Sequence, residues 1–180
     1  AGGKLMAIET FRAAVRSWEH REMPSVLTEK VYRFFGFASM EEMLNDFLDR
    51  QVDSVPGELT LVLHDAVNEG DPLATRILAE TGRELGLAAR SVMKRVGDFG
   101  IGEVPIVLVG SVFQRGRSSC LLENLDRTVR DEFADFKLVI PEMEPVFGAV
   151  LLAMDHLSIA ASPRTIERFN GYRREPVHEE

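Results

Sequence analysis

The sequence predicts a mixed α/β fold in which helices dominate. Over residues 4–97, apolar side chains recur every three or four positions, as they do along one face of a helix. From residue 104 onward the pattern becomes strand, helix, strand, helix. A chain of 180 residues is long enough for one hydrophobic core. We therefore expect a helical portion over about residues 4–97, packed against a βαβα portion over about residues 104–161.

Five helices are expected in the first portion, over about residues 5–18, 28–36, 40–51, 58–70 and 72–97. Ser39 and Glu42 form a capping box just before the third helix. Gly70 suits the end of the fourth helix, because glycine tolerates the left-handed conformation found there. Asp71 then supplies an N-cap and Pro72 a first helical residue. We therefore interpret Asp71 as a helix cap rather than as a catalytic acid.

The second portion is expected to form a parallel sheet unit. Ile106–Val109 is a continuous apolar run, which suits a strand that is buried on both faces. A helix over about residues 118–132 follows, then a second strand over Phe136–Ile140 and a last helix from Pro145. Such a βαβ unit is right-handed, so both strands end on one edge, where ligands of open α/β sheets bind. Two strands do not complete a sheet, so more strands are required than this chain offers.

Composition excludes several classes of function. The chain has 29 acidic and 21 basic side chains and a net charge of −8, so nucleic acid is not an expected partner. Cys120 is the only cysteine, which rules out an internal disulfide and a four-cysteine metal site. No apolar run approaches the length of a membrane span. We expect a soluble, cytoplasmic protein that has no membrane partner and no metal site of its own.

Two motifs follow the expected strands. The segment VLVGSVF occupies residues 107–113, and PVFGAVLLA occupies residues 145–153. Together they resemble the adenosine motif and the second connecting motif of actin-like sugar kinases, and more narrowly those of the N-acetylglucosamine kinase and BadF/BadG/BcrA/BcrD-type ATPase family. Three shorter segments agree with the C-terminal half of that family, namely GKLMAI at residues 3–8, EGDPL at 69–73 and RELG at 83–86. The resemblance covers roughly residues 1–157.

The resemblance implies both a fold and a ligand. The fold is the C-terminal lobe of an actin-like (ribonuclease H-like) ATPase over residues 1–161, mostly helical with an incomplete parallel sheet, followed by a polar tail over residues 162–180. The ligand is ATP, with Mg²⁺ held mainly by the N-terminal half of such proteins. The adenosine pocket would be lined by Gly57, Gly110, Ser111, Arg115 and Gly148. Glycine at a strand end also has a physical reason, since a residue without Cβ lets the backbone approach a purine closely.

The catalytic parts of this family lie upstream of the region that Ala1 matches. These parts are the phosphate-binding loops, the acid that activates the sugar hydroxyl and the magnesium ligand, so we assign no catalytic residue to this chain. We hypothesise that this chain is the C-terminal part of an ATP-dependent sugar kinase. The complete kinase would phosphorylate an amino-sugar hydroxyl, and this part alone would be inactive. The expected partners are ATP or ADP, the amino sugar, and either a second copy or the missing N-terminal half.

Two alternatives stay open at this point. Activator ATPases of the same family hold an iron–sulfur cluster with paired cysteines, an arrangement that Cys120 alone does not match. The other alternative is a non-catalytic helical interaction module whose βαβ part is purely structural. The methionines and phenylalanines of the first three helices fit either a core or a surface for a partner domain; they are Met6, Phe11, Phe34, Phe35, Met40, Met43 and Phe47.

Overall fold

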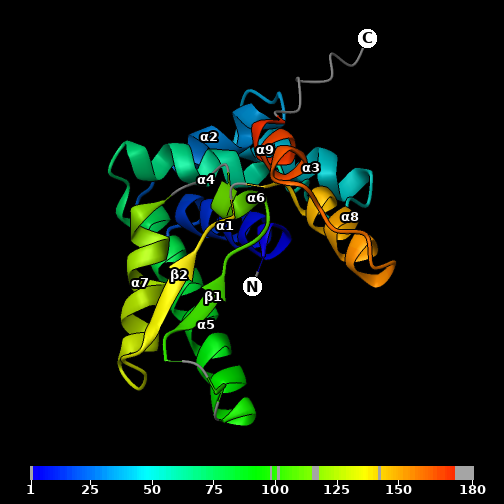
Figure 1. Cartoon of the computed structure of the whole chain (residues 1–180). Coiled ribbons are helices and arrows are strands. Elements are labelled where there is room, and N and C mark those ends of the chain that lie inside the picture. Colours follow the sequence, from blue (N-terminus) through cyan, green and yellow to red (C-terminus); the bar gives the residue numbers. More distant parts are fainter. Residues whose placement is uncertain (1, 98, 101, 115–117, 142, 173–180) are drawn as a thin grey trace.

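The computed structural model describes residues 2–97, 99–100, 102–114, 118–141 and 143–172. Most of this described part is helical, and a small parallel sheet accompanies the helices, which is compatible with an α/β fold (Figure 1). The elements in chain order are α1 Gly3–Trp18, α2 Leu27–Phe34, α3 Met40–Asp49, α4 Leu59–Asn68, α5 Pro72–Val96, β1 Val104–Val107, α6 Ser111–Gln114, α7 Ser119–Arg130, β2 Phe136–Val139, α8 Pro145–His156 and α9 Pro163–Gly171.

Helices α1 to α5 pack around a shared hydrophobic core, which confirms the helical reading of the N-terminal portion. The methionines singled out in the sequence are buried in this core, with Met6, Met40 and Met43 all at most 2% exposed. Phenylalanine rings surround them, and the Phe11 and Phe47 rings stack with centroids 5.9 Å apart. Phe11, Phe35 and Phe47 pack against this core, whereas Phe34 is 38% exposed. Most of these side chains therefore serve as core, with Phe34 as the exception.

Helix caps hold this helical portion together. The backbone N–H of Glu42 donates to Ser39 Oγ at 3.1 Å, and Glu42 accepts from the Ala38 N–H at 2.9 Å, as expected for a capping box. Asp71 is only 6% exposed and accepts from the Ala74 N–H at 2.8 Å, so it caps α5. Its carboxylate also accepts from the Ser25 hydroxyl and, at 2.9 Å, from the Val26 N–H. One carboxylate therefore joins the starts of α2 and α5, which confirms its structural role.

Two glycines allow α5 and α7 to pack closely. A Cβ built on Gly82 would lie 2.3 Å from the backbone oxygen of Leu121, and one built on Gly86 would lie 2.6 Å from Thr128 Cβ. Neither distance is possible for a real side chain, so glycine at both positions sets the separation of the two helices. This packing explains the glycine of the RELG segment, Gly86, whose structural role the sequence did not reveal.

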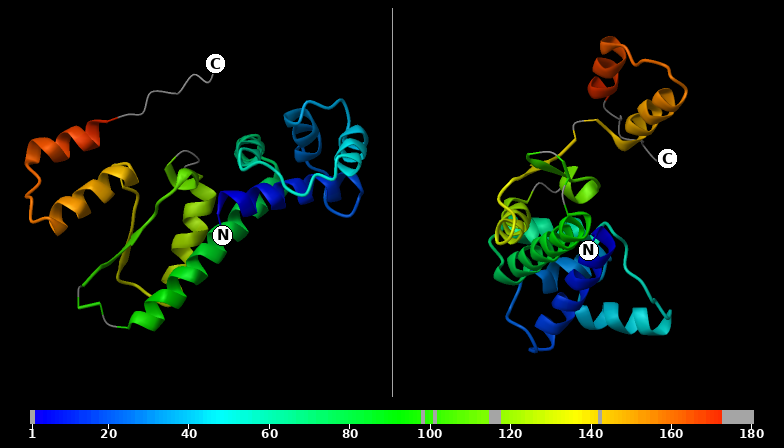
Figure 2. Two further views of the ribbon diagram at one scale, coloured as in Figure 1. Left: turned by 90° about the vertical axis from the view of Figure 1, so that its right-hand side faces the viewer. Right: turned by 60° about the horizontal axis from the view of Figure 1, so that its bottom comes forward.

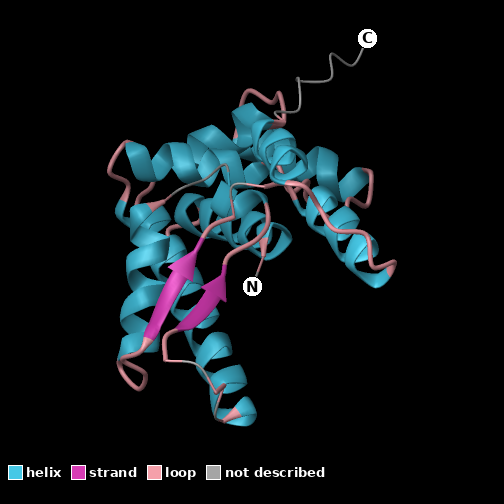
Figure 3. Ribbon diagram, in the orientation of Figure 1, coloured by secondary structure: helices cyan, strands magenta, loops and turns pink. Residues whose placement is uncertain are grey.

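The two strands pair in parallel, as the sequence predicts (Figure 3). Val104 pairs with Phe136 and Val107 with Val139, and α7 makes the connection between them. Helices α5 and α7 cover one face of this sheet, where Leu108 and Phe136 are buried against side chains of both helices. The carboxyl ends of both strands therefore lie on one edge.

The expectation that the first strand is buried on both faces is wrong. Strand β1 begins at Val104 and its residues alternate between partly buried and exposed. Val107 is 53% exposed and Val109 is 57% exposed, because these side chains point away from α5 and α7. The continuous apolar run thus describes a strand whose second face has no covering layer in the described part of the chain.

Helices α8 and α9 form a hairpin that stands away from the core (Figure 2). Neither helix contains a buried residue. The hairpin is held by ring contacts, in which Phe147 stacks on Phe169 at 4.7 Å and meets Tyr172 edge-on at 5.1 Å. Residues 162–180 were expected to form a polar tail, but Ser162 caps a helix there by accepting from the Thr165 N–H at 3.1 Å.

Candidate nucleotide site at the strand ends

The candidate site begins where β1 and β2 end side by side. Beyond the last residue pair, the Leu108 N–H donates to the Val139 carbonyl at 2.8 Å, so the two strands stay paired for one more hydrogen bond. Leu108 is 5% exposed and fixes the end of β1 on the core. The segments that follow, 109–111 and 140–141, leave from this common edge. Ligands of parallel sheets bind at such an edge.

Gly110 adopts a conformation that favours glycine at this edge. Its φ angle is +107°, a region that residues with a Cβ rarely adopt. Its carbonyl accepts from the Phe113 N–H at 3.1 Å, which turns the chain into α6. A Cβ built on Gly110 would meet no described atom within 4 Å, so open space adjoins its backbone. Glycine is therefore set here by the backbone turn and leaves room for a ligand.

Helix α6 connects this turn to the helical core. Val112 and Phe113 both pack against the core that α1 to α5 form. A Cβ built on Gly3 would lie 3.9 Å from Val112 Cγ2, so the start of α1 adjoins α6. Ser111 is the first residue of α6, and only its backbone is described. Arg115, the fourth predicted contact, lies outside the described residues.

Gly148 lies on the chain that follows the other strand. It is in the first turn of α8, which begins at Pro145, and its N–H donates to the Glu144 carbonyl at 3.5 Å. A Cβ built on Gly148 would also meet no described atom within 4 Å. The strand pairing thus brings the segment of Gly110 and Ser111 to the same edge as the segment that leads to Gly148.

Gly57 belongs to a different part of the fold. It precedes α4, and its carbonyl accepts from the Thr60 hydroxyl at 2.8 Å. Helix α4 packs mainly on α1, α2 and α5. Strand pairing therefore does not bring Gly57 to the site, and its contact with a nucleotide stays a prediction.

The described residues at this edge carry few ionisable groups. Within residues 107–114, 140–141 and 143–148, the described part contains one titratable side chain, that of Glu144. Glu144 makes no side-chain capping bond to α8. Apart from Glu144, the described groups at this edge are backbone groups and uncharged side chains.

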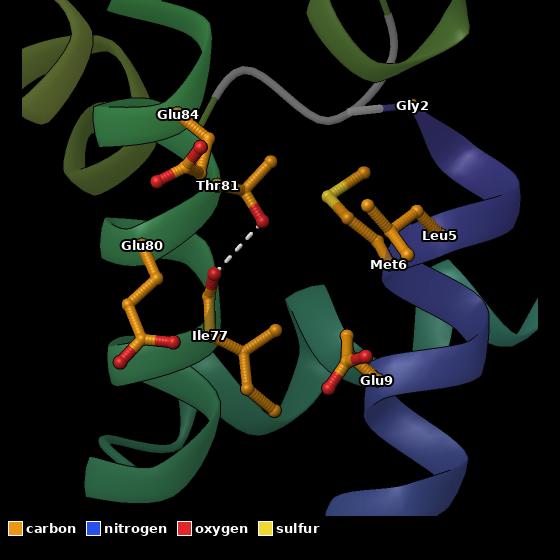
Figure 4. A pocket seen from close by; sticks show the side chains of 8 residues that line it. All are labelled: Gly2, Leu5, Met6, Glu9, Ile77, Glu80, Thr81 and Glu84. Carbon is orange, nitrogen blue, oxygen red and sulfur yellow. Dashed lines mark hydrogen bonds between the residues drawn. The ribbon is translucent and has the colours of Figure 1, made fainter. Parts of the chain in front are cut away.

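A separate cavity of about 190 Å³ lies between α1 and α5 (Figure 4). The Thr81 hydroxyl in its wall donates to the Ile77 carbonyl at 2.9 Å and is thereby engaged within its own helix. Three carboxylates around the cavity would repel the phosphates of a nucleotide, so it is a poor nucleotide site. The residues that line the cavity are Gly2, Leu5, Met6, Glu9, Ile77, Glu80, Thr81 and Glu84.

Over the described ranges of the chain, no group of three or more His, Cys, Asp or Glu could hold a metal ion.

The sequence indicated the two glycines at the edge but missed their supports. Val112 and Phe113 were noticed only as apolar residues of a motif, whereas they anchor α6 in the helical core. Phe147 was noticed only as part of PVFGAVLLA, whereas its ring holds α9. The pattern of apolar residues along the sequence could not reveal the anchoring of α6 or of α9, since both depend on contacts between segments far apart in the chain.

Comparison with known proteins finds a sugar kinase that is similar to this chain. No protein-family model matches the chain, and no solved structure matches it significantly. The chain is similar to the N-acetylmuramic acid/N-acetylglucosamine kinase of Clostridium acetobutylicum, with 25% identity over 149 residues. The aligned region is 82% of this chain and 48% of that kinase, so the chain spans about half the length of the curated relative.

This similarity supports a relation to sugar kinases. It agrees with the class of protein to which the sequence motifs pointed. Among the described residues, no helix combines the length and the apolar character needed to cross a membrane.

Proposed function

We propose that this chain is the adenosine-binding C-terminal part of an ATP-dependent sugar kinase. Its fold would be the C-terminal lobe of an actin-like ATPase, and the complete protein would phosphorylate a hydroxyl of an amino sugar such as N-acetylglucosamine. The similarity to a kinase whose name includes N-acetylglucosamine supports this proposal, as do the motifs at residues 107–113 and 145–153.

One structural observation carries the proposal. The parallel pairing of β1 with β2 places the turn at Gly110 on the same edge as the chain leading to Gly148, and open space adjoins both glycines. The carboxyl edge of parallel strands is where a nucleotide is expected in this class of fold. Gly110, Ser111 and Gly148 would contact the adenosine, and Gly57 and Arg115 would complete the pocket.

The proposal divides the chemistry between this chain and the rest of the kinase. Phosphoryl transfer depends on neutralising and orienting the phosphates, with Mg²⁺ bridging them. The edge described here offers a single carboxylate, Glu144, and no basic side chain among its described residues. Phosphate, Mg²⁺ and sugar contacts would come mainly from the other half, so we expect this chain alone to bind nucleotide weakly and to transfer no phosphate.

Calorimetric titration of the 180-residue chain with ATP, ADP and adenosine tests the proposal. We expect all three to bind weakly and with similar affinity, because the adenosine carries most of the contacts. Replacing Gly110 with Ala should weaken binding by about tenfold or more, which corresponds to about 1.4 kcal/mol. Gly36→Ala is the matched control, since Gly36 also has a positive φ, +81°, and no described atom within 4 Å of its Cβ position.

The result that would overturn the proposal is equally specific. Absence of adenosine-dependent heat with a folded chain would remove the nucleotide site. Equal loss of binding in Gly36→Ala and Gly110→Ala would show that the loss reflects backbone strain rather than contact with the ligand. Phosphorylation of N-acetylglucosamine by this chain alone would refute the division of labour.

A further inference from the structure

Helix α6 follows directly after the turn at Gly110, and the Phe113 side chain anchors it. The Phe113 ring packs against both hydrophobic cores of the molecule, the one that α1 to α5 form and the one that α5 and α7 form with the sheet. Leu85 on α5 and Leu122 on α7 share this position between the two cores. Phe113 therefore ties the segment that follows β1 to the junction of the two cores.

The backbone of the same residue closes the turn. The Phe113 N–H donates to the Gly110 carbonyl at 3.1 Å, and Gly110 has a φ angle of +107°. Before the turn, Leu108 is 5% exposed and its N–H donates to the Val139 carbonyl. Between these two anchors Val109 is 57% exposed, and a Cβ built on Gly110 would meet no described atom within 4 Å. The two ends of the segment therefore set the conformation of the turn.

We propose that Phe113 is a positioning residue that holds the Gly110 turn in the conformation that binds the nucleoside. This inference rests on the proposed nucleotide site, and it assigns Phe113 no contact of its ring with the ligand. While the ring is anchored between the cores, the Phe113 N–H stays within reach of the Gly110 carbonyl. Without that anchor Gly110 can adopt many backbone conformations, because a residue that lacks Cβ is the least restricted.

Val112 supports α6 on one side but does not replace the Phe113 ring. A Cβ built on Gly3 would lie 3.9 Å from Val112 Cγ2, so Val112 reaches the start of α1. Val112 is packed against the helical core, whereas Phe113 is packed against the helical core and the core of the sheet. Phe113 therefore fixes α6 relative to both the strands and the helices, which the turn at Gly110 connects.

Loss of the anchor should weaken nucleoside binding without removing a contact with the ligand. A site that adopts its binding conformation for only a fraction of the time binds with an affinity reduced by that fraction. If Phe113→Ala lowers this fraction to about a tenth, the dissociation constant for adenosine rises about tenfold. Phe113→Leu keeps a large apolar side chain at the same position, so it should restore most of the lost affinity.

Two measurements on the same variants test the proposal. The first is the pair of three-bond HN–Hα couplings of Gly110 in the free chain, which report its φ angle, and the second is the dissociation constant for adenosine from calorimetric titration. We expect Phe113→Ala to change the couplings toward averaged values and to raise the dissociation constant about tenfold. We expect Phe113→Leu to return both quantities toward the wild-type values, although it also lacks the aromatic ring.

Leu122→Ala is the matched control. Leu122 is also partly buried at the junction of the two cores, but it lies on α7 and not on the segment that follows β1. Its truncation should lower the urea unfolding midpoint much as Phe113→Ala does, since both remove apolar side chains from the same junction. The couplings of Gly110 and the affinity for adenosine should stay near the wild-type values. Phe113→Val takes the place of Phe113→Ala if the alanine chain does not fold.

Unchanged Gly110 couplings in the folded Phe113→Ala chain would overturn the proposal. An equal loss of adenosine affinity in Leu122→Ala would also overturn it, because the loss would then reflect general loosening of the junction. Failure of the proposed function is distinguishable from both results. A wild-type chain that binds no adenosine removes the nucleotide site, whereas the Gly110 couplings of the free variants still decide whether Phe113 holds the turn.

Discussion

Replacing Gly82 with alanine should destabilise the fold through the contact of α5 with α7. The new Cβ would lie 2.3 Å from the Leu121 backbone oxygen and 3.1 Å from Asn124 Cβ. A backbone atom of a packed helix cannot move away alone, so the two helices must separate. Overpacking of this kind typically costs about 1–3 kcal/mol.

Two opposing effects set the net magnitude. Alanine has a higher helix propensity than glycine by about 1 kcal/mol, which offsets part of the cost. A contact as short as 2.3 Å with backbone lies at the severe end of overpacking, so we expect a net loss of about 2 kcal/mol. At a urea m-value of about 2 kcal/mol/M, the unfolding midpoint should fall by about 1 M.

Urea unfolding followed by circular dichroism measures this shift. Arg83→Ala is the control in the same helix, since Arg83 is exposed and its described ion pair is with its neighbour Glu84. Its effect should stay within about 0.5 kcal/mol. If Gly82→Ala instead raised stability, as at an open helical position, the close approach of α5 and α7 would be wrong.

Two further predictions concern the helical portion. Asp71→Ala removes the acceptor for the Val26 N–H, the Ala74 N–H and the Ser25 hydroxyl. We expect it to lower the free energy of unfolding in urea by about 2–4 kcal/mol. A loss below about 0.5 kcal/mol would contradict the role of Asp71 in joining the starts of α2 and α5. The hydrogen bond from Arg76 lowers the pKa of Glu22 below its ordinary value, so this pair contributes stability above the ordinary pKa and loses it as pH falls through the lowered pKa. Thermal unfolding of Arg76→Met should therefore lose less stability than wild type between about pH 5 and about pH 3, and equal losses would count against the pair.

The helical portion was largely predictable because its signals are local. Ser39 with Glu42, and Asp71 with Pro72, mark helix starts through bonds to residues three positions away. The core positions of Met6 and Met43 follow from helical spacing. Such patterns act within one or two turns, so the sequence alone determines them.

The sheet was predicted in topology but not in burial. The order of strand, helix and strand implied the parallel pairing that Val107 and Val139 show. Exposure of Val107 and Val109 depends on whether a layer covers the second face, which the composition of one strand cannot reveal. Helix α9 was missed because its polar sequence suggests a tail, whereas Phe169 stacks on a ring that precedes it by more than twenty residues.

At the candidate site, the sequence indicated which residues lie at the strand ends but not how they are supported. Gly110 was expected from the strand-to-turn change, and its φ of +107° gives the conformational reason. The anchoring of Val112 against the start of α1 required the fold, because Gly3 and Val112 are more than a hundred positions apart.

Amide chemical-shift mapping with adenosine and ADP locates the nucleoside site, which we propose at the carboxyl edge of β1 and β2. We expect the largest shifts on Val109 to Phe113 and on Phe147 to Ala149, with the same pattern for both ligands. Shifts clustered around Glu9, Glu80 and Glu84 between α1 and α5, or no shifts at saturating adenosine, would contradict it.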